Sequence, residues 1–180
     1  MCRYFSQKGA SWEEMDIVSL FPEEKEVVGP GEKAVVFLPS SQGGITPIRL
    51  SFGFPLRDKL VLNARAETAG EKPFFSDSFL HHPCLVPVSR FYETSPEGEE
   101  LSYAGEGTLL LAAFWRNGQF VLLTAKPSYR SSAHFLRGPI PLKEEDALAY
   151  LGEGRAKMDL AKTLQSPFFP EKGAVQQTLF

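Results

Sequence analysis

The second residue of the chain, Cys2, combines two reactive groups once the initiator Met1 has been removed. Initiator removal is usual when the second residue is small, as cysteine is. The new terminus carries an α-amine and a thiol on adjacent carbons, with reference pKa values of about 8 and 8.5. An aldehyde would condense with the amine to an imine, and the thiol would close on the imine to a thiazolidine. A second-position cysteine is more often incidental, and a retained Met1 would block the amine.

A dense polar stretch, Asn63–Thr68, begins where the apolar run over 59–63 ends. Alternate residues of a strand point the same way, so Asn63 and Arg65 would share a face. An asparagine amide can orient a reactive group, and an arginine can clamp a phosphate. The alternative is an ordinary solvated loop.

Two further titratable residues could assist such chemistry. Glu93 ends an aromatic segment and is either an exposed edge residue or a half-buried acid whose raised pKa lets it shuttle protons. His134 is one of three histidines, and a lone histidine is usually structural or solvated. Because the chain has no CxxC or HExxH spacing, we expect no metal site, and the chemistry needs no organic cofactor.

The composition is that of an ordinary globular protein. A chain of 180 residues suits one domain, and 15 phenylalanines predict a Phe-rich core. The formal net charge is -3, so any nucleic-acid contact must come from a local cluster of Arg and Lys. No apolar run reaches the roughly 18 residues that span a bilayer, and we find no signal peptide. Two cysteines are too few for a disulfide framework, so we expect a cytoplasmic protein without a membrane partner.

The elements that must position these residues are mostly short strands. The strongest local signal is Asn117-Gly118 between the expected strands 108–115 and 119–124, which predicts a tight hairpin. Many strands with few helices predict an α+β domain, compact and mostly antiparallel, with a partly barrel-like sheet over residues 1–170 and a tail over 171–180. Other expected strands cover 34–38, 48–54, 59–63, 84–88 and 90–93, and expected helices cover 11–20, 72–80 and 144–150.

Four segments have an order and spacing that resemble the SRAP family, the SOS response-associated peptidases or abasic-site processing proteins. The NARAET and EKP block followed by CLVP and FYE carries most of the specificity. The resemblance runs from Cys2 to about Leu142. The segments are Met1–Tyr4, Asn63–Thr68 with Glu71–Pro73, Cys84–Pro87 with Phe91–Glu93, and His134–Pro139.

This resemblance implies a mostly β domain with a positively charged groove for single-stranded DNA. Cys2 would form a thiazolidine with the ring-opened abasic sugar, Asn63 would position the reacting groups, and Glu93 would assist proton transfer. The family histidine, approximated by His134, would assist ring opening and crosslink reversal. The family is also credited with β-lyase strand scission and removal of its own first residue. A monomer suffices, and a nucleoid location would follow. The side chains expected to contact DNA are Arg3, Phe52, Arg65 and Arg137.

The sequence departs from the family pattern in several places. The family's glycine after the cysteine is absent, so Cys2 adjoins Arg3 and the thiol is shifted by one residue. Phe52 and Thr94 each replace a tryptophan. In the motif close to H-x-R-M-P, His134 stands one position too early. Cys2, Asn63 and Glu93 therefore carry more of the prediction than His134.

The last five residues of the chain resemble the pentapeptide that docks on bacterial sliding clamps. Leu179 and Phe180 would fill an apolar pocket and Gln176 would make polar contacts, in a segment ordered on binding. The alternatives are an unconstrained tail and a terminal strand packed on the core.

Two other functions stay open from the sequence. A single-stranded-DNA-binding module that has lost the chemistry would bind plain and abasic strands equally. An N-terminal-nucleophile peptidase would use Cys2 to attack an amide, with its own α-amine as base. A cysteine-protease dyad of Cys2 with His134 lacks a supporting local signature.

Overall fold

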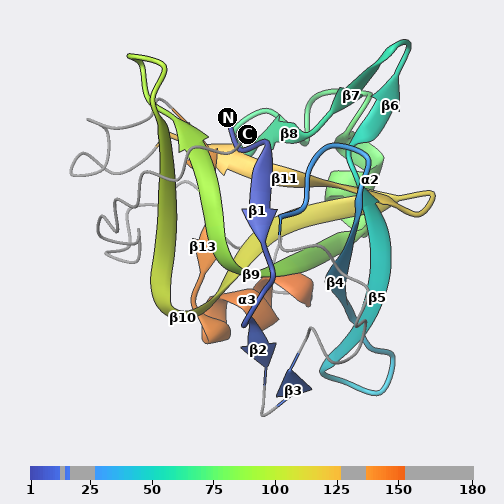
Figure 1. Ribbon diagram of the computed structural model, residues 1–180. Helices are drawn as coiled ribbons and strands as arrows, with labels where there is room; N and C mark the ends of the chain where they lie inside the picture. Colours follow the sequence, from blue (N-terminus) through green and yellow to red (C-terminus); the bar gives the residue numbers. More distant parts are fainter. Residues whose placement is uncertain (13–14, 17–26, 127–136, 153–180) are drawn as a thin grey trace.

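The computed structural model describes residues 1–12, 15–16, 27–126 and 137–152 (Figure 1). In these ranges strands predominate, and the helices are α2 (Ser76–His81) and α3 (Glu144–Leu151). No helix among these residues is both long and apolar enough to cross a bilayer. The strands are β1 (Tyr4–Ser6), β2 (Ser11–Trp12), β3 (Met15–Asp16), β4 (Lys33–Pro39), β5 (Ile45–Phe52), β6 (Phe54–Leu56), β7 (Lys59–Val61), β8 (Asn63–Arg65), β9 (Pro83–Thr94), β10 (Glu100–Arg116), β11 (Gln119–Ala125), β12 (Gly138–Pro139) and β13 (Pro141–Leu142).

Nine of these strands form one sheet that curves back on itself. Hydrogen bonding runs in the order β1-β9-β4-β5-β11-β10-β13, and β9 also pairs with β10, so five strands close a ring. Strands β8 and β12 join the sheet through β11. Neighbours are antiparallel except where β11 meets β5 and β8. The predicted α+β domain with a mostly antiparallel, curved sheet is confirmed.

Phenylalanines fill the ring. Phe5, Phe52 and Phe120 are fully buried. The ring centroids of Phe52 and Phe120 lie 5.2 Å apart in a stacked arrangement, and Phe5 meets Phe52 edge-on at 5.3 Å. A second group centres on Phe114, which Phe54 contacts at 5.8 Å. Because each aromatic ring removes a large apolar area from water, these contacts stabilise the closed sheet.

Turn chemistry explains the sharpest reversal in the sheet. Asn117 and Gly118 both have positive φ, at 48° and 76°. Two consecutive left-handed residues match the twist of a two-residue hairpin, which joins β10 directly to β11. The predicted hairpin is confirmed, as is the final helix, whose C-cap is Gly152.

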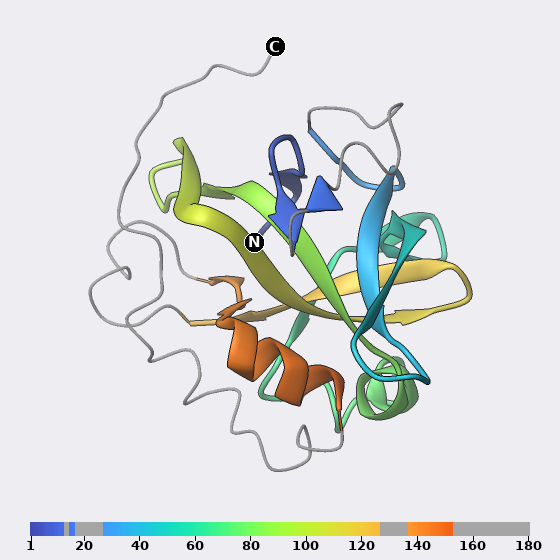
Figure 2. The same ribbon diagram turned by 90° about the horizontal axis from the view of Figure 1, so that it is seen from below.

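Helix α3 covers one end of the ring. Figure 2 shows α3 beside the β10 side of the sheet, and the Tyr150 hydroxyl donates a hydrogen bond to the Ala113 carbonyl. Ala147, Tyr150 and Leu151 are its buried residues. In Figure 1 the N-terminus lies at the upper end of the sheet and α3 at the lower end.

Several expected elements differ from the structure. The helix expected over 11–20 is wrong in its described part, where Ser11–Trp12 pairs with Met15–Asp16 as two short strands. The strands expected over 84–88 and 90–93 are one continuous strand, β9. The helix expected over 72–80 begins only at Ser76, because turns occupy the residues before it.

Candidate functional site

Strand β1 carries the N-terminus to the C-terminal end of β9. Its register with β9 pairs Tyr4 with Tyr92 and Phe5 with Phe91. Because the strands are antiparallel, the residues before Tyr4 run toward Glu93 and Thr94. Beyond β1, Gln7 holds the sheet together: its amide nitrogen donates to the carbonyls of Val35 and Pro87, each at 2.8 Å. Gln7 lies outside every sequence motif, and no feature of its neighbours signalled this role.

An ion pair joins the N-terminus to Glu93. The Met1 α-amine nitrogen lies 2.7 Å from Glu93 Oε2, and the Glu93 side chain is fully buried. Burial raises the pKa of Glu93 to about 7, although the nearby ammonium group opposes this shift. Glu93 Oε1 has no hydrogen-bond partner in the described part of the chain. Glu93 can therefore gain and lose a proton near neutral pH.

Asn63 approaches the same terminus from β8. Its amide Nδ2 donates a hydrogen bond of 2.8 Å to the Cys2 carbonyl oxygen. Strand β8 is fixed by parallel pairing with β11, which sets Asn63 opposite Leu122. The Asn63 Oδ1 atom is buried and lacks a hydrogen-bond partner among the described residues. Cys2, Asn63 and Glu93, from three separate segments, thus meet at one point.

The Cys2 thiol is enclosed in this structure, which retains Met1. Cys2 is fully buried, and its Sγ donates to the Tyr4 carbonyl at 3.3 Å. Burial raises the pKa of the thiol well above its ordinary value, and the charge of Glu93 adds to the shift. Sγ is therefore a neutral thiol at pH 7. The glycine missing after Cys2 does not move the terminus away from Asn63 or Glu93.

Two of the four expected DNA-binding residues lie at the surface near this site. Arg3, next to Cys2, is exposed. Arg65 is exposed on β8, whereas Ala64 between Asn63 and Arg65 is 2% exposed. The alternation agrees with the prediction that Asn63 and Arg65 share a face.

Arg137 and Phe52 need correction. Arg137 Nη2 lies 2.6 Å from Glu67 Oε2 and donates to the Thr124 carbonyl at 2.9 Å, and its side chain is 13% exposed. Its guanidinium is held by these two contacts, so it links the turn after β8 to the end of β11 and is not a free phosphate clamp. Phe52 is fully buried and stacked on Phe120, so it cannot stack on a DNA base.

Glu67, which holds Arg137, contrasts with Glu93. Partial burial raises the pKa of Glu67, but the hydrogen bond and charge of Arg137, helped by Arg65, outweigh that effect. The pKa of Glu67 therefore lies below its ordinary value, and this carboxylate stays ionised at neutral pH. The ion pair is a fixed structural contact beside the site.

Tyr103 is a neighbour of Glu93 that sequence motifs did not indicate. It lies on β10, and its ring stacks on Phe91 with centroids 5.3 Å apart. Burial, together with the Glu93 charge, raises the pKa of Tyr103 to about 12. Tyr103 is therefore a neutral wall of the site and does not act as a base near pH 7.

Four expected functional residues, His134, Gln176, Leu179 and Phe180, lie outside the described residues. Their roles stay predictions.

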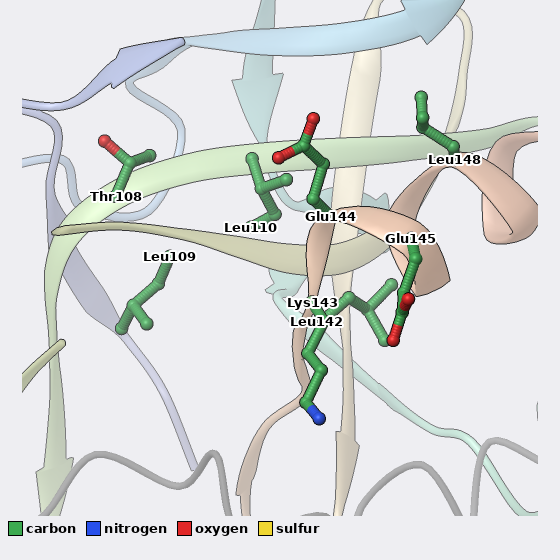
Figure 3. A pocket seen from close by; sticks show the side chains of 8 residues that line it. All are labelled: Thr108, Leu109, Leu110, Leu142, Lys143, Glu144, Glu145 and Leu148. Atoms are coloured by element: carbon green, nitrogen blue, oxygen red, sulfur yellow. The ribbon is translucent and has the colours of Figure 1, made fainter. Parts of the chain in front are cut away.

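A separate hollow of about 610 Å³ lies between β10 and α3 (Figure 3). Its lining combines four leucines with charged residues at the start of α3. None of the Cys2, Asn63 and Glu93 side chains lines it. The lining residues are Thr108, Leu109, Leu110, Leu142, Lys143, Glu144, Glu145 and Leu148.

Comparisons with known proteins agree with this architecture. Residues 43–177 match the model of the family described as SOS response associated peptidase (SRAP). The match therefore covers Asn63 and Glu93 but not the N-terminal residues. No curated protein matches the chain.

Three of the solved structures with a similar fold come from two bacteria. A protein from Bacteroides thetaiotaomicron has a TM-score of 0.64 at 20% identity and covers 91% of this chain and 86% of its own. A protein from Bordetella bronchiseptica has a TM-score of 0.70 at 16% identity and covers 91% and 93%. A phage-related protein from the same organism has a TM-score of 0.65 at 22% identity and covers 89% and 88%. At these identities the comparison establishes the fold alone.

Proposed function

Because the chain belongs to the SRAP family and its Cys2 lies between Asn63 and Glu93, we propose that it captures abasic sites in single-stranded DNA covalently. Family membership supports a general function related to abasic sites and DNA damage. The finer proposal is a thiazolidine crosslink through Cys2 after removal of Met1. The single observation that carries it is the meeting of the terminus with a buried acid and an amide donor.

Removal of Met1 would free the α-amine of Cys2 beside Glu93. The hydrogen bond from Asn63 is made to the Cys2 carbonyl oxygen, which is retained when Met1 leaves. The residue therefore stays anchored while its amine becomes a nucleophile. With a pKa of about 7, Glu93 can accept the ammonium proton and then return a proton to the departing oxygen.

The thiol would close the ring in a second step. The neutral Cys2 Sγ–H adds to the imine carbon, and its proton passes to the imine nitrogen, which gives a five-membered thiazolidine. A thiol with a raised pKa suits this order, because it stays protonated until the imine has formed. Its burial also limits reaction with other electrophiles.

Electrostatic attraction would bring the strand to this point. Arg3 adjoins Cys2 in the sequence and Arg65 lies two residues after Asn63; both are exposed, and both can contact phosphates. We propose that binding weakens as salt rises. Strand scission and removal of Met1 by the protein itself are further activities that the family resemblance implies.

The decisive test uses abasic single-stranded DNA and the processed protein. We expect a covalent adduct that survives denaturing electrophoresis, and its loss in Cys2→Ala. Cys2→Ser keeps the amine and a side chain of similar size, so it controls for packing and should also fail to form a stable adduct. Cys84→Ser is the matched control, because Cys84 is equally buried but is not at the terminus. An adduct formed equally by Cys2→Ser would refute the thiazolidine.

A further inference from the structure

The unprocessed chain already presents an amine at the site. The Met1 α-amine lies 2.7 Å from Glu93 Oε2, and Met1 is 66% exposed. A blocked terminus was expected from the sequence, because a peptide bond occupies the Cys2 nitrogen. The structure instead puts a second primary amine beside the same carboxylate. From this geometry we propose that the chain retaining Met1 cleaves abasic strands through an imine on the Met1 amine, whereas the processed chain holds them covalently.

This inference rests on the proposed function, since it uses the same substrate and the same acid. What it adds is a different nucleophile with a different outcome. The substrate class is a ring-opened sugar aldehyde with a phosphate on its 3′ oxygen. Met1 is an exposed residue whose amine is held at Glu93, whereas Cys2 is fully buried.

The first step joins the amine to the sugar. Glu93 accepts a proton from the ammonium, and the neutral nitrogen adds to C1′ of the aldehyde. The carbinolamine then loses its oxygen as water, with a proton returned by Glu93. The product is a protonated imine on Met1, and no oxidant or reductant is consumed.

The second step breaks the strand. The protonated imine acidifies C2′, and the Glu93 carboxylate beside the nitrogen removes a proton from that carbon. The C–H electron pair becomes a C2′=C3′ double bond while the C3′–O bond breaks, and the 3′ phosphate leaves with the bonding electrons. Water hydrolyses the remaining imine, which releases an unsaturated aldehyde and restores the Met1 amine.

The unprocessed chain lacks the means to trap the imine. Methionine has a thioether in place of a thiol. Closure by Cys2 would need a much larger ring that includes the Met1–Cys2 peptide bond, and Cys2 Sγ is buried and bonded to the Tyr4 carbonyl. The imine on Met1 therefore proceeds to elimination and hydrolysis, so the chain turns over. Removal of one residue would convert a strand-cleaving enzyme into a crosslinking protein.

The experiment compares two forms of one sequence. Expression with methionine aminopeptidase inhibited or overproduced gives the unprocessed and processed chains, which intact mass distinguishes. Each is incubated with an abasic single-stranded oligonucleotide, with and without sodium borohydride, which reduces imines to stable amines. The unprocessed chain with its α-amine acetylated is the matched control, because it differs only at the proposed nucleophile.

We expect the unprocessed chain to cleave at least about tenfold faster than the acetylated chain, to form an adduct only with borohydride, and to carry it on Met1 in peptide mass spectra. We expect the processed chain to form an adduct without borohydride. Equal cleavage by the unprocessed and acetylated chains, or trapping on a lysine, would overturn the inference while the crosslink of the processed chain still supports the proposed function. Failure of the processed chain to form an adduct would instead refute the proposed function.

Discussion

Two glutamates near the site, Glu93 and Glu67, show how the same type of side chain can have two different roles. Glu93 is fully buried, contacts the α-amine through one oxygen, and has a pKa raised to about 7. Glu67 is partly exposed, is held by Arg137 at 2.6 Å, and has a lowered pKa. One carboxylate exchanges protons near neutral pH, and the other stays charged and holds Arg137 in a fixed contact. The sequence motifs alone do not reveal this difference, because it depends on how deeply each carboxylate is buried and on whether its partner is a fixed arginine.

The largest expected difference between Glu93 and Glu67 is in the rate of crosslink formation. We expect Glu93→Gln to slow crosslink formation by about 10³-fold, because the amide cannot take the ammonium proton. Glu67→Gln, the matched control, should change that rate by less than about threefold, since Glu67 does not contact the terminus. Single-turnover gel assays between pH 6 and 8 measure both. The rate of the wild-type protein should rise with pH through about 7. An equal loss of rate in the two variants would contradict the different roles of the two glutamates.

The pH dependence of stability gives a second, smaller test. The pKa of Glu93 rises on folding from 4.5 to about 7, so the folded state binds the proton more tightly. This stabilisation is complete below pH 4.5 and is lost as pH rises to about 7, at a total cost of about 3 kcal/mol. Urea denaturation at pH 5 and pH 8 should show this fall in the wild type and lose most of it in Glu93→Gln. The same slope in both proteins would assign the fall to other groups.

The smallest effect should come from the Glu67–Arg137 pair. Its carboxylate is 40% exposed, so solvent screens the attraction. We expect Glu67→Gln to lower the free energy of unfolding by about 1 kcal/mol at low salt and by less in high salt. Urea denaturation at two salt concentrations measures this. A loss that high salt does not reduce would show that solvent does not screen this ion pair.

Local signals predicted much of the fold. Asn117-Gly118 specifies its own turn, because both residue types tolerate the left-handed conformation that a two-residue hairpin requires. The helix expected from Ser11 failed because capping patterns describe isolated segments. In the fold the Ser11 amide donates to Thr108 Oγ1 on β10 at 2.7 Å, a contact between residues far apart in sequence.

The candidate site was predictable in its identities but not in its surroundings. Family motifs indicated Cys2, Asn63 and Glu93, yet it is the register of β1 on β9 and of β8 on β11 that brings them together. The role expected for Phe52 failed because β5 alternates and turns Leu50 and Phe52 inward. The role expected for Arg137 failed because its partner, Glu67, lies in another motif, and a sequence does not reveal such pairs.

The buried amide of Gln7 has a practical consequence for handling the protein. With Gln7 bound to Val35 and Pro87 on one side of β1, and Asn63 holding Cys2 on the other, the leading strand is tethered at both ends. An affinity tag fused ahead of Met1 would extend into solvent from this exposed residue and would not disturb the fold. The tagged protein would be fully folded but would have no amine beside Glu93. A purification tag should therefore be placed elsewhere on the chain.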